Sequence, residues 1–201
     1  MISNLLLIPN QITAIRFFVV PVMWVCAYRG QLTNIGIGFL ICFLSDLFDG
    51  IAARKLDQTS SFGSKFDSIA DQFLQISALI WILMLMPEIL TENLLISLLA
   101  ITIYLTSLFV GLVKFKQIAN LHLYLSKLGA LFLFVFLIHA FLTGVYNPYL
   151  FYLAAVSFIL SSSETLILQL SSPFVDSNMG SIFFRYIEDD HPVRYWLSRL
   201  P

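Results

Sequence analysis

The chain has 201 residues, of which 59% are hydrophobic and 11% are charged. Soluble domains carry about 25% charged residues, so this composition excludes an ordinary soluble domain and favours a polytopic membrane protein with one membrane domain. The formal net charge of −1 lacks the basic footprint of a nucleic-acid-binding protein, so no nucleic-acid partner is expected.

Six apolar stretches, taken in chain order, are each long enough to cross a bilayer as a helix. They cover residues 11–28, 34–53, 67–86, 94–113, 123–143 and 148–170. Pro9 and Asn10 predict the start of the first helix, with Asn10 as its N-cap. Proline-containing turns at residues 86–88 and 146–148 separate later helices. The expected fold is therefore all-α: a polytopic integral membrane protein with six transmembrane helices.

The basic residues predict the orientation of these helices. In a six-span chain they fall on one side of the membrane, with Arg29 as the exception. Because positive charge marks the cytoplasmic side, both termini are expected to be cytoplasmic. Residues 1–171 would form the membrane domain, and residues 172–201 a cytoplasmic or membrane-surface C-terminal tail.

The densest polar pattern joins the cytoplasmic ends of the second and third helices. One helix face carries residues at i, i+3, i+4, i+7 and i+8, and the next carries residues at i, i+4 and i+8. These residues are, in order, Asp46, Asp49, Gly50, Ala53 and Arg54, followed by Gly63, Asp67 and Asp71. The connection between the helices is short, so they pack as neighbours and four carboxylates converge.

Aspartates at a membrane are costly, so four of them need a compensating charge. Two divalent cations would balance the four carboxylates, and oxygen ligands favour Mg²⁺, Mn²⁺ or Ca²⁺. A two-metal site suits phosphoryl transfer, because it clamps both oxygens of the displacement. The metal ligands are therefore predicted to be Asp46, Asp49, Asp67 and Asp71.

Small residues on the same faces predict a nucleotide slot beside the metals. Gly50, Ala53 and Gly63 remove side chains, so a flat base or a diphosphate can approach the helix backbone. Arg54 supplies a planar fork for phosphate oxygens. Together these residues predict a nucleoside-diphosphate site.

Two other interpretations of the aspartates stay open. They could form the proton or cation relay of a transporter, because intramembrane carboxylates often do so. Asp46 and Asp49 could also simply form structural ion pairs with Arg54, Lys55 and Lys65. The spacing favours the metal site, since all eight fixed positions would match by chance about once in 10⁹ to 10¹⁰ starting points at average residue usage.

The pattern D-x2-D-G-x2-A-R-x8-G-x3-D-x3-D resembles the signature of the CDP-alcohol phosphotransferase family at all eight fixed positions. Residues 8–21 also resemble the start of the phosphatidylglycerophosphate synthase branch. The resemblance implies an enzyme of phospholipid biosynthesis in the bacterial inner membrane, with its active site on the cytoplasmic side. It would move a phosphatidyl group from a CDP-linked lipid, with CDP-diacylglycerol as the expected donor, to an alcohol and release CMP. A homodimer is left open.

Carried over by position, the resemblance assigns roles to the motif residues. The four aspartates would hold two Mg²⁺ or Mn²⁺ ions, and Asp71 would also act as the general base. Gly50, Ala53 and Gly63 would line the slot for cytidine and diphosphate, with Arg54 close to phosphate.

The acceptor alcohol stays open at this stage. A phosphorylated acceptor, such as glycerol 3-phosphate or inositol phosphate, would need cations near the cytoplasmic face, and Arg16, Lys114 and Lys127 are the candidates. Phosphatidylglycerophosphate synthases usually carry an Arg-Glu pair in the fourth span and a lysine after the last motif aspartate, whereas this chain has neither, and Gln72 follows that aspartate. A neutral or lipid acceptor, such as phosphatidylglycerol, is therefore an alternative, and Glu164 in the sixth span could orient its hydroxyl.

Overall fold

The computed structural model describes residues 7–171, except for residues 57, 59 and 116–123. In this part of the chain all regular structure is helical, and six helices are long and apolar enough to cross a membrane. They are α2 (Ile8–Tyr28), α3 (Leu32–Lys55), α4 (Ser61–Leu85), α6 (Leu94–Phe115), α7 (Tyr124–Thr143) and α8 (Pro148–Ser171), and α5 (Glu88–Thr91) is a single turn. The predicted all-α, six-span fold is confirmed, while the predicted tail, residues 172–201, lies outside the described residues.

The helix starts differ from the sequence prediction at two places. Helix α2 begins at Ile8, with Pro9 in its first turn, where a missing N–H costs nothing. Asn10 therefore lies inside the helix with its side chain buried, and its prediction as the N-cap is wrong. Helix α4 begins six residues before the predicted span, because the Ser60 hydroxyl accepts a hydrogen bond from the Gly63 N–H at 2.9 Å and caps its first turn.

The turn between α2 and α3 shows why the chain reverses there. Gly30 has φ +66°, a left-handed conformation that glycine adopts without a Cβ penalty. Its N–H donates to the Ala27 carbonyl at 3.0 Å, and the Gln31 N–H donates to the Cys26 carbonyl at 2.9 Å. This pair of bonds closes the helix with a Schellman motif and starts α3 two residues later.

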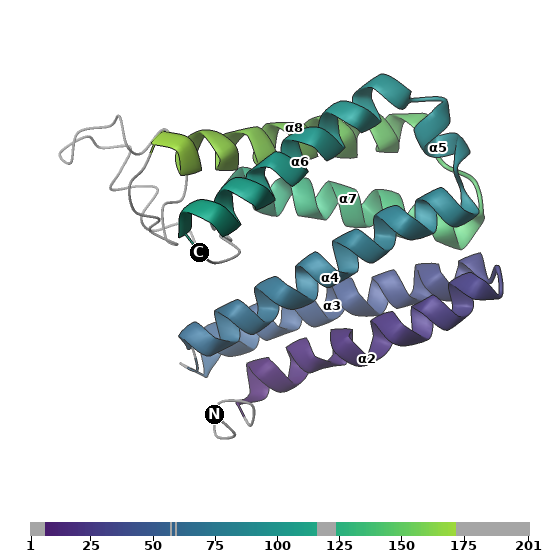
Figure 1. Cartoon of the computed structure of the whole chain (residues 1–201). Helices are drawn as coiled ribbons and strands as arrows, with labels where there is room; N and C mark the ends of the chain where they lie inside the picture. Colours follow the sequence, from purple (N-terminus) through teal and green to yellow (C-terminus); the bar gives the residue numbers. More distant parts are fainter. Residues whose placement is uncertain (1–6, 57, 59, 116–123, 172–201) are drawn as a thin grey trace.

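The helices form two groups of three that share one long contact. Helix α2 packs against both α3 and α4, helix α8 packs against both α6 and α7, and α3 packs against α7 between the groups (Figure 1). The motif helices α3 and α4 are therefore joined mainly through α2, whereas the short connection predicts that they pack directly on each other. Phe39 of α3 lies at the centre of the shared core, with ring centroids 5.7 Å from Trp81 and 5.4 Å from Phe141. Gly36 lets α3 and α7 approach closely, because a Cβ there would lie 2.7 Å from the backbone nitrogen of Leu142.

The distribution of side chains is that of a membrane protein. Large apolar side chains face outward, including Phe18, which is 76% exposed, and Leu95, which is 85% exposed. Polar side chains such as Asn10, Thr13 and Asp49 are instead buried between the helices. The interior therefore gathers the groups that lipid would not tolerate.

One end of the bundle holds the helix ends that the motif joins. The spans alternate in direction, so the start of α2, the connection from α3 to α4 and the end of α8 lie together (left side of Figure 1). Asp46 and Asp49 lie in the last three turns of α3, and Asp67 and Asp71 in the first three turns of α4. The motif is thus brought to this end of the bundle, inside the membrane domain.

Candidate active site

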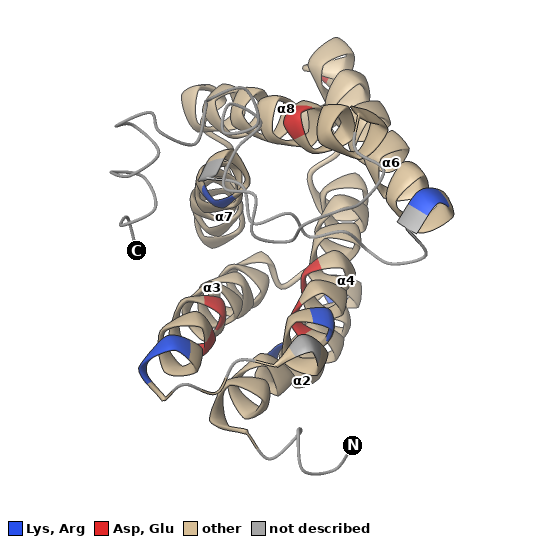
Figure 2. Ribbon diagram, turned by 90° about the vertical axis from the view of Figure 1, so that its left-hand side faces the viewer, with Lys and Arg blue, Asp and Glu red and all other residues tan. Residues whose placement is uncertain are grey.

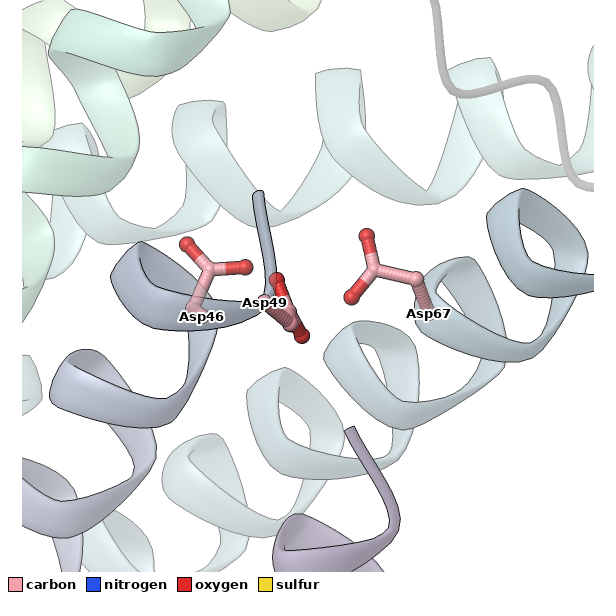
Figure 3. A group of neighbouring side chains, drawn as sticks. All are labelled: Asp46, Asp49 and Asp67. Atoms are coloured by element: carbon pink, nitrogen blue, oxygen red, sulfur yellow. The ribbon is translucent and has the colours of Figure 1, made fainter. Parts of the chain in front are cut away.

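The four motif aspartates converge from α3 and α4, the two helices against which α2 packs. Asp46 and Asp49 point from α3 toward Asp67 on α4 (Figure 3), and one carboxylate oxygen from each lies within 4.8 Å of the others. Viewed from that end of the bundle, the acidic segments of α3 and α4 face each other across the space between the helices (Figure 2). Asp71 lies one turn beyond Asp67 on α4. The predicted convergence of carboxylates is therefore present.

A single arginine reaches all four carboxylates. Arg16 of α2 is 1% exposed, and its Nη2 lies 2.5 Å from both Asp49 Oδ2 and Asp67 Oδ1. Its Nη1 lies 3.4 Å from Asp46 Oδ1 and pairs closely with Asp71 Oδ1. Among the described residues, the aspartates thus pair with a cation from α2.

The basic residues of the motif region behave differently. Arg54, Lys55 and Lys65 make no ion pair with these aspartates in the described part of the chain. All three are exposed, and the Arg54 Nε donates to the Gly50 carbonyl of its own helix at 3.2 Å. The structural ion pairs considered for them on sequence grounds are not formed.

The donor set fits divalent metal ions. Four carboxylates against one guanidinium leave three formal negative charges if all the carboxylates are ionised. The guanidinium also leaves its Nε buried without a hydrogen-bond partner among the described residues. All the ligands are oxygens, which hard cations such as Mg²⁺ and Mn²⁺ prefer. The cluster therefore has the net negative charge and the carboxylate oxygens that are needed to bind divalent cations.

A polar face of α2 supports the cluster, a role that was not predicted from the sequence, where Asn10 is expected as an N-cap and Arg16 as an acceptor cation. The Thr13 hydroxyl lies 2.7 Å from Asp49 Oδ2 and 3.1 Å from the Pro9 carbonyl, so it can donate to either. Asn10, Thr13 and Arg16 follow at spacings of three in an otherwise apolar helix. That spacing places them on one face and is the signal that could have identified them.

The small residues of the motif line the same cavity, for different reasons. A Cβ on Gly50 would meet no atom within 4 Å, so this position faces open space. A Cβ on Gly63 would instead lie 2.5 Å from Asn10 Oδ1, so glycine here also allows α2 and α4 to approach. Ala53 and Arg54 line the cavity beside Gly50. The structure thus brings the four predicted slot residues to one wall.

The cavity itself has a volume of about 870 Å³ and extends beyond the aspartates. One wall is the motif face of α3 and α4, and the other is built from α6, α7 and α8. Apolar side chains such as Phe134 and Phe158 alternate with hydroxyl and amide groups along the second wall. The space therefore joins the aspartate cluster to a partly polar region in which Lys127 is the charged residue among those described.

The four candidate acceptor residues lie in different places. Lys127 of α7 lines the cavity. Lys114 donates to the carbonyls of Gln169 and Leu170 at 2.6 and 3.2 Å, where it binds the last turn of α8. Glu164 is buried on α8 outside the cavity wall, and Arg16 lies within the aspartate cluster.

Comparisons with known proteins find one matching family model and several similar proteins with phosphatidyltransferase names. The family model described as CDP-alcohol phosphatidyltransferase matches residues 6–162. A protein of Rickettsia felis named CDP-diacylglycerol–glycerol-3-phosphate 3-phosphatidyltransferase is 37% identical over 70 residues, which cover 33% of this chain and 39% of that protein. A protein of the same name from Wigglesworthia glossinidia brevipalpis is 34% identical over 79 residues, covering 38% and 43%.

One similar protein spans almost the whole chain. A Candida albicans protein named CDP-diacylglycerol–inositol 3-phosphatidyltransferase is 26% identical over 200 residues, which cover 94% of this chain and 86% of that protein. The bacterial matches, by contrast, span about two fifths of the relatives' own length. No solved structure matches the chain.

Proposed function

Because the chain belongs to the CDP-alcohol phosphatidyltransferase family, we propose that it moves a phosphatidyl group from a CDP-linked lipid to an alcohol and releases CMP. The observation that carries this proposal is the convergence of all four motif aspartates on one wall of an open cavity within the membrane domain. The expected donor is CDP-diacylglycerol, which the names of the similar bacterial and yeast proteins contain. The transporter alternative gains no support from the family match.

Two divalent ions, Mg²⁺ or Mn²⁺, are proposed to bind Asp46, Asp49, Asp67 and Asp71. When bound, such ions withdraw charge from the phosphoryl oxygens and stabilise the leaving group. The three formal negative charges that remain after pairing with Arg16 support this proposal. Thr13 would keep the Asp49 carboxylate oriented toward the cluster.

The nucleotide is proposed to lie against α3, on the cavity wall formed by Gly50, Ala53 and Arg54. Gly50 leaves room for the cytidine and diphosphate, since a side chain there would enter the open space. Arg54 would bind phosphate oxygens with its terminal nitrogens, because its Nε is bound to the Gly50 carbonyl. Gly63 completes this wall from α4.

The chemical step needs one base, and Asp71 is the proposed one. The acceptor hydroxyl would form a new O–P bond with the lipid-side phosphorus while the bond from that phosphorus to the CMP oxygen breaks. The hydroxyl proton would pass to the Asp71 carboxylate, and the negative charge would leave with CMP. Asp71 lines the cavity between Asp67 and Gln75 along α4, which suits a group that meets both substrates.

The site is proposed to open on the cytoplasmic side of a bacterial inner membrane. The basic residues predict this orientation, and the bacterial sources of the similar proteins support the compartment.

The test is to incubate the purified protein in lipid micelles with CDP-diacylglycerol, Mg²⁺ and a panel of alcohols. CMP and a new phosphatidyl lipid should form in equal amounts. Asp67→Ala should abolish both products, while the exposed α2 variant Gln11→Leu should leave them unchanged. Formation of neither product with any alcohol would contradict the proposed activity.

A further inference from the structure

The cavity extends beyond Asp71 into a region where, apart from Lys127, the polar groups of the described lining are uncharged amides and hydroxyls. Its walls there carry Gln72 and Gln75 from α4, Tyr104 and Ser107 from α6, and Ser161 and Gln169 from α8. Amides and hydroxyls are costly inside apolar spans, so their gathering on one cavity wall needs an explanation.

Two hydrogen bonds orient the amides of this wall. The Tyr104 hydroxyl donates to Gln72 Oε1, and the Ser107 hydroxyl donates to Gln169 Oε1 at 3.3 Å. Each of these two amide oxygens thus already accepts a hydrogen bond, and the NH₂ group of each amide can donate two. The hydroxyl oxygens of Tyr104 and Ser107 keep lone pairs that can accept. The wall therefore offers donors and acceptors side by side.

Gln75 adds an acceptor that lacks a donor. It lies one helical turn beyond Asp71, on the same face of α4. Its Oε1 is buried and has no hydrogen-bond partner among the described residues. A buried acceptor without a donor is unfavourable, so a ligand hydroxyl that reached it would be stabilised.

The cations near this wall are largely engaged elsewhere. Arg16 pairs with the aspartates, and Lys114 binds the carbonyls at the end of α8. Lys127 is the candidate acceptor cation that lines the described cavity. A phosphate group only accepts hydrogen bonds and favours several charged donors, whereas a hydroxyl both donates and accepts.

We propose that the acceptor alcohol is a soluble, uncharged polyhydroxylated compound, whose hydroxyls bind Gln72, Gln75 and Tyr104 next to Asp71. This inference rests on the proposed function, because it names the second substrate of the same site. One hydroxyl would reach the Asp71 carboxylate, and its neighbours on the same carbon skeleton would satisfy the amides of α4.

Matched pairs of acceptors test the inference directly. CMP release is measured with inositol against inositol 1-phosphate, with glycerol against glycerol 3-phosphate, and with phosphatidylglycerol. The uncharged soluble alcohols should be the better substrates of each pair. Gln75→Leu should raise the KM of the uncharged acceptor about fivefold, the scale of one neutral hydrogen bond, with little change in kcat. Gln11→Leu is the same substitution at an exposed position outside the cavity and should leave KM unchanged.

The outcomes separate this inference from the proposed function. Turnover only with phosphorylated or lipid acceptors would overturn the inference and leave the function intact, as would an unchanged KM in Gln75→Leu. A large rise of the acceptor KM in Lys127→Ala would also overturn it. If no alcohol releases CMP, equilibrium dialysis of labelled inositol decides: binding that is lost in Gln75→Leu supports the polyol site, and no binding to the wild type contradicts it.

Discussion

The Arg16→Met variant removes the positive charge from the centre of the aspartate cluster and keeps a side chain of similar length. In the described part of the chain Arg16 is the cation that pairs with all four carboxylates, and it is 1% exposed. Without it the cluster would carry four formal negative charges in place of three. The folded, metal-free state should therefore be strongly destabilised.

The burial of these ion pairs determines how much stability the variant should lose. Removal of one partner from a buried ion pair typically costs about 3–5 kcal/mol, because an uncompensated charge is left behind. Most of this cost should come from Asp49, Asp67 and Asp71, since the Asp46 side chain is 43% exposed and its pairing is weak. For a domain of this length, that loss corresponds to a decrease of about 6–20 °C in Tm.

Divalent ions should reverse the loss of thermal stability in Arg16→Met. In the wild type a bound ion must compete with the guanidinium for the carboxylates, whereas in Arg16→Met the carboxylates are uncompensated. An ion at a hundredfold excess over its Kd stabilises by about 2.7 kcal/mol. Mg²⁺ should therefore raise the Tm of the variant by more than that of the wild type.

The assay is thermal unfolding in micelles, followed with a thiol-reactive dye, in chelator and in excess Mg²⁺. Cys42 is fully buried and reports unfolding when its thiol becomes accessible. Arg29→Met is the matched control, because Arg29 is exposed at the far end of the same helix. Equal Tm values for Arg16→Met and wild type in chelator, or equal increments on adding Mg²⁺, would refute the reasoning.

Three further predictions concern the motif residues. Asp71→Asn keeps the shape of the carboxylate but cannot take a proton, so kcat should fall about 10²-fold or more while the KM for CDP-diacylglycerol is retained; wild-type turnover would exclude Asp71 as the base. Gly50→Leu should raise the KM for CDP-diacylglycerol without lowering Tm, since the position faces open space, whereas unchanged kinetics would mean that the nucleotide lies elsewhere. Gly63→Ala should destabilise by about 1–3 kcal/mol, because its Cβ would meet Asn10 Oδ1 at 2.5 Å. Adding Asn10→Ala to that variant should restore much of the Tm, and simple additivity of the two losses would contradict this contact.

The six spans and the convergence of the motif aspartates could be predicted from the sequence alone. Hydropathy identifies spans because burial in lipid depends mainly on composition over about 20 residues. The spacing of the aspartates places each pair on one face of its helix. The short connection predicts direct packing of α3 on α4, whereas α2 packs against both of them, because the contacts of a helix depend on tertiary packing and not on loop length alone. The boundaries were less certain, because the polar first turns of α4 carry no hydropathy signal and depend on the Ser60 cap.

The contacts of Arg16, Lys114 and Glu164 could not be predicted in the same way. All three were candidate acceptor residues because they are charged groups within or near a span. Their partners depend on how α2, α6 and α8 rotate about their own axes and on which helix each contacts, and tertiary packing decides both. The structure directs Arg16 to the aspartates and Lys114 to the end of α8, and it places Glu164 away from the cavity wall.

The central claim is metal-dependent transfer of a phosphatidyl group at the four aspartates. The most direct measurement is CMP release from CDP-diacylglycerol by one protein sample before chelation, in excess chelator, and after Mg²⁺ or Mn²⁺ is added back. Release should stop in chelator and recover with either ion in the wild type, and it should never start in Asp67→Ala. Full release in excess chelator, or in Asp67→Ala, would contradict it.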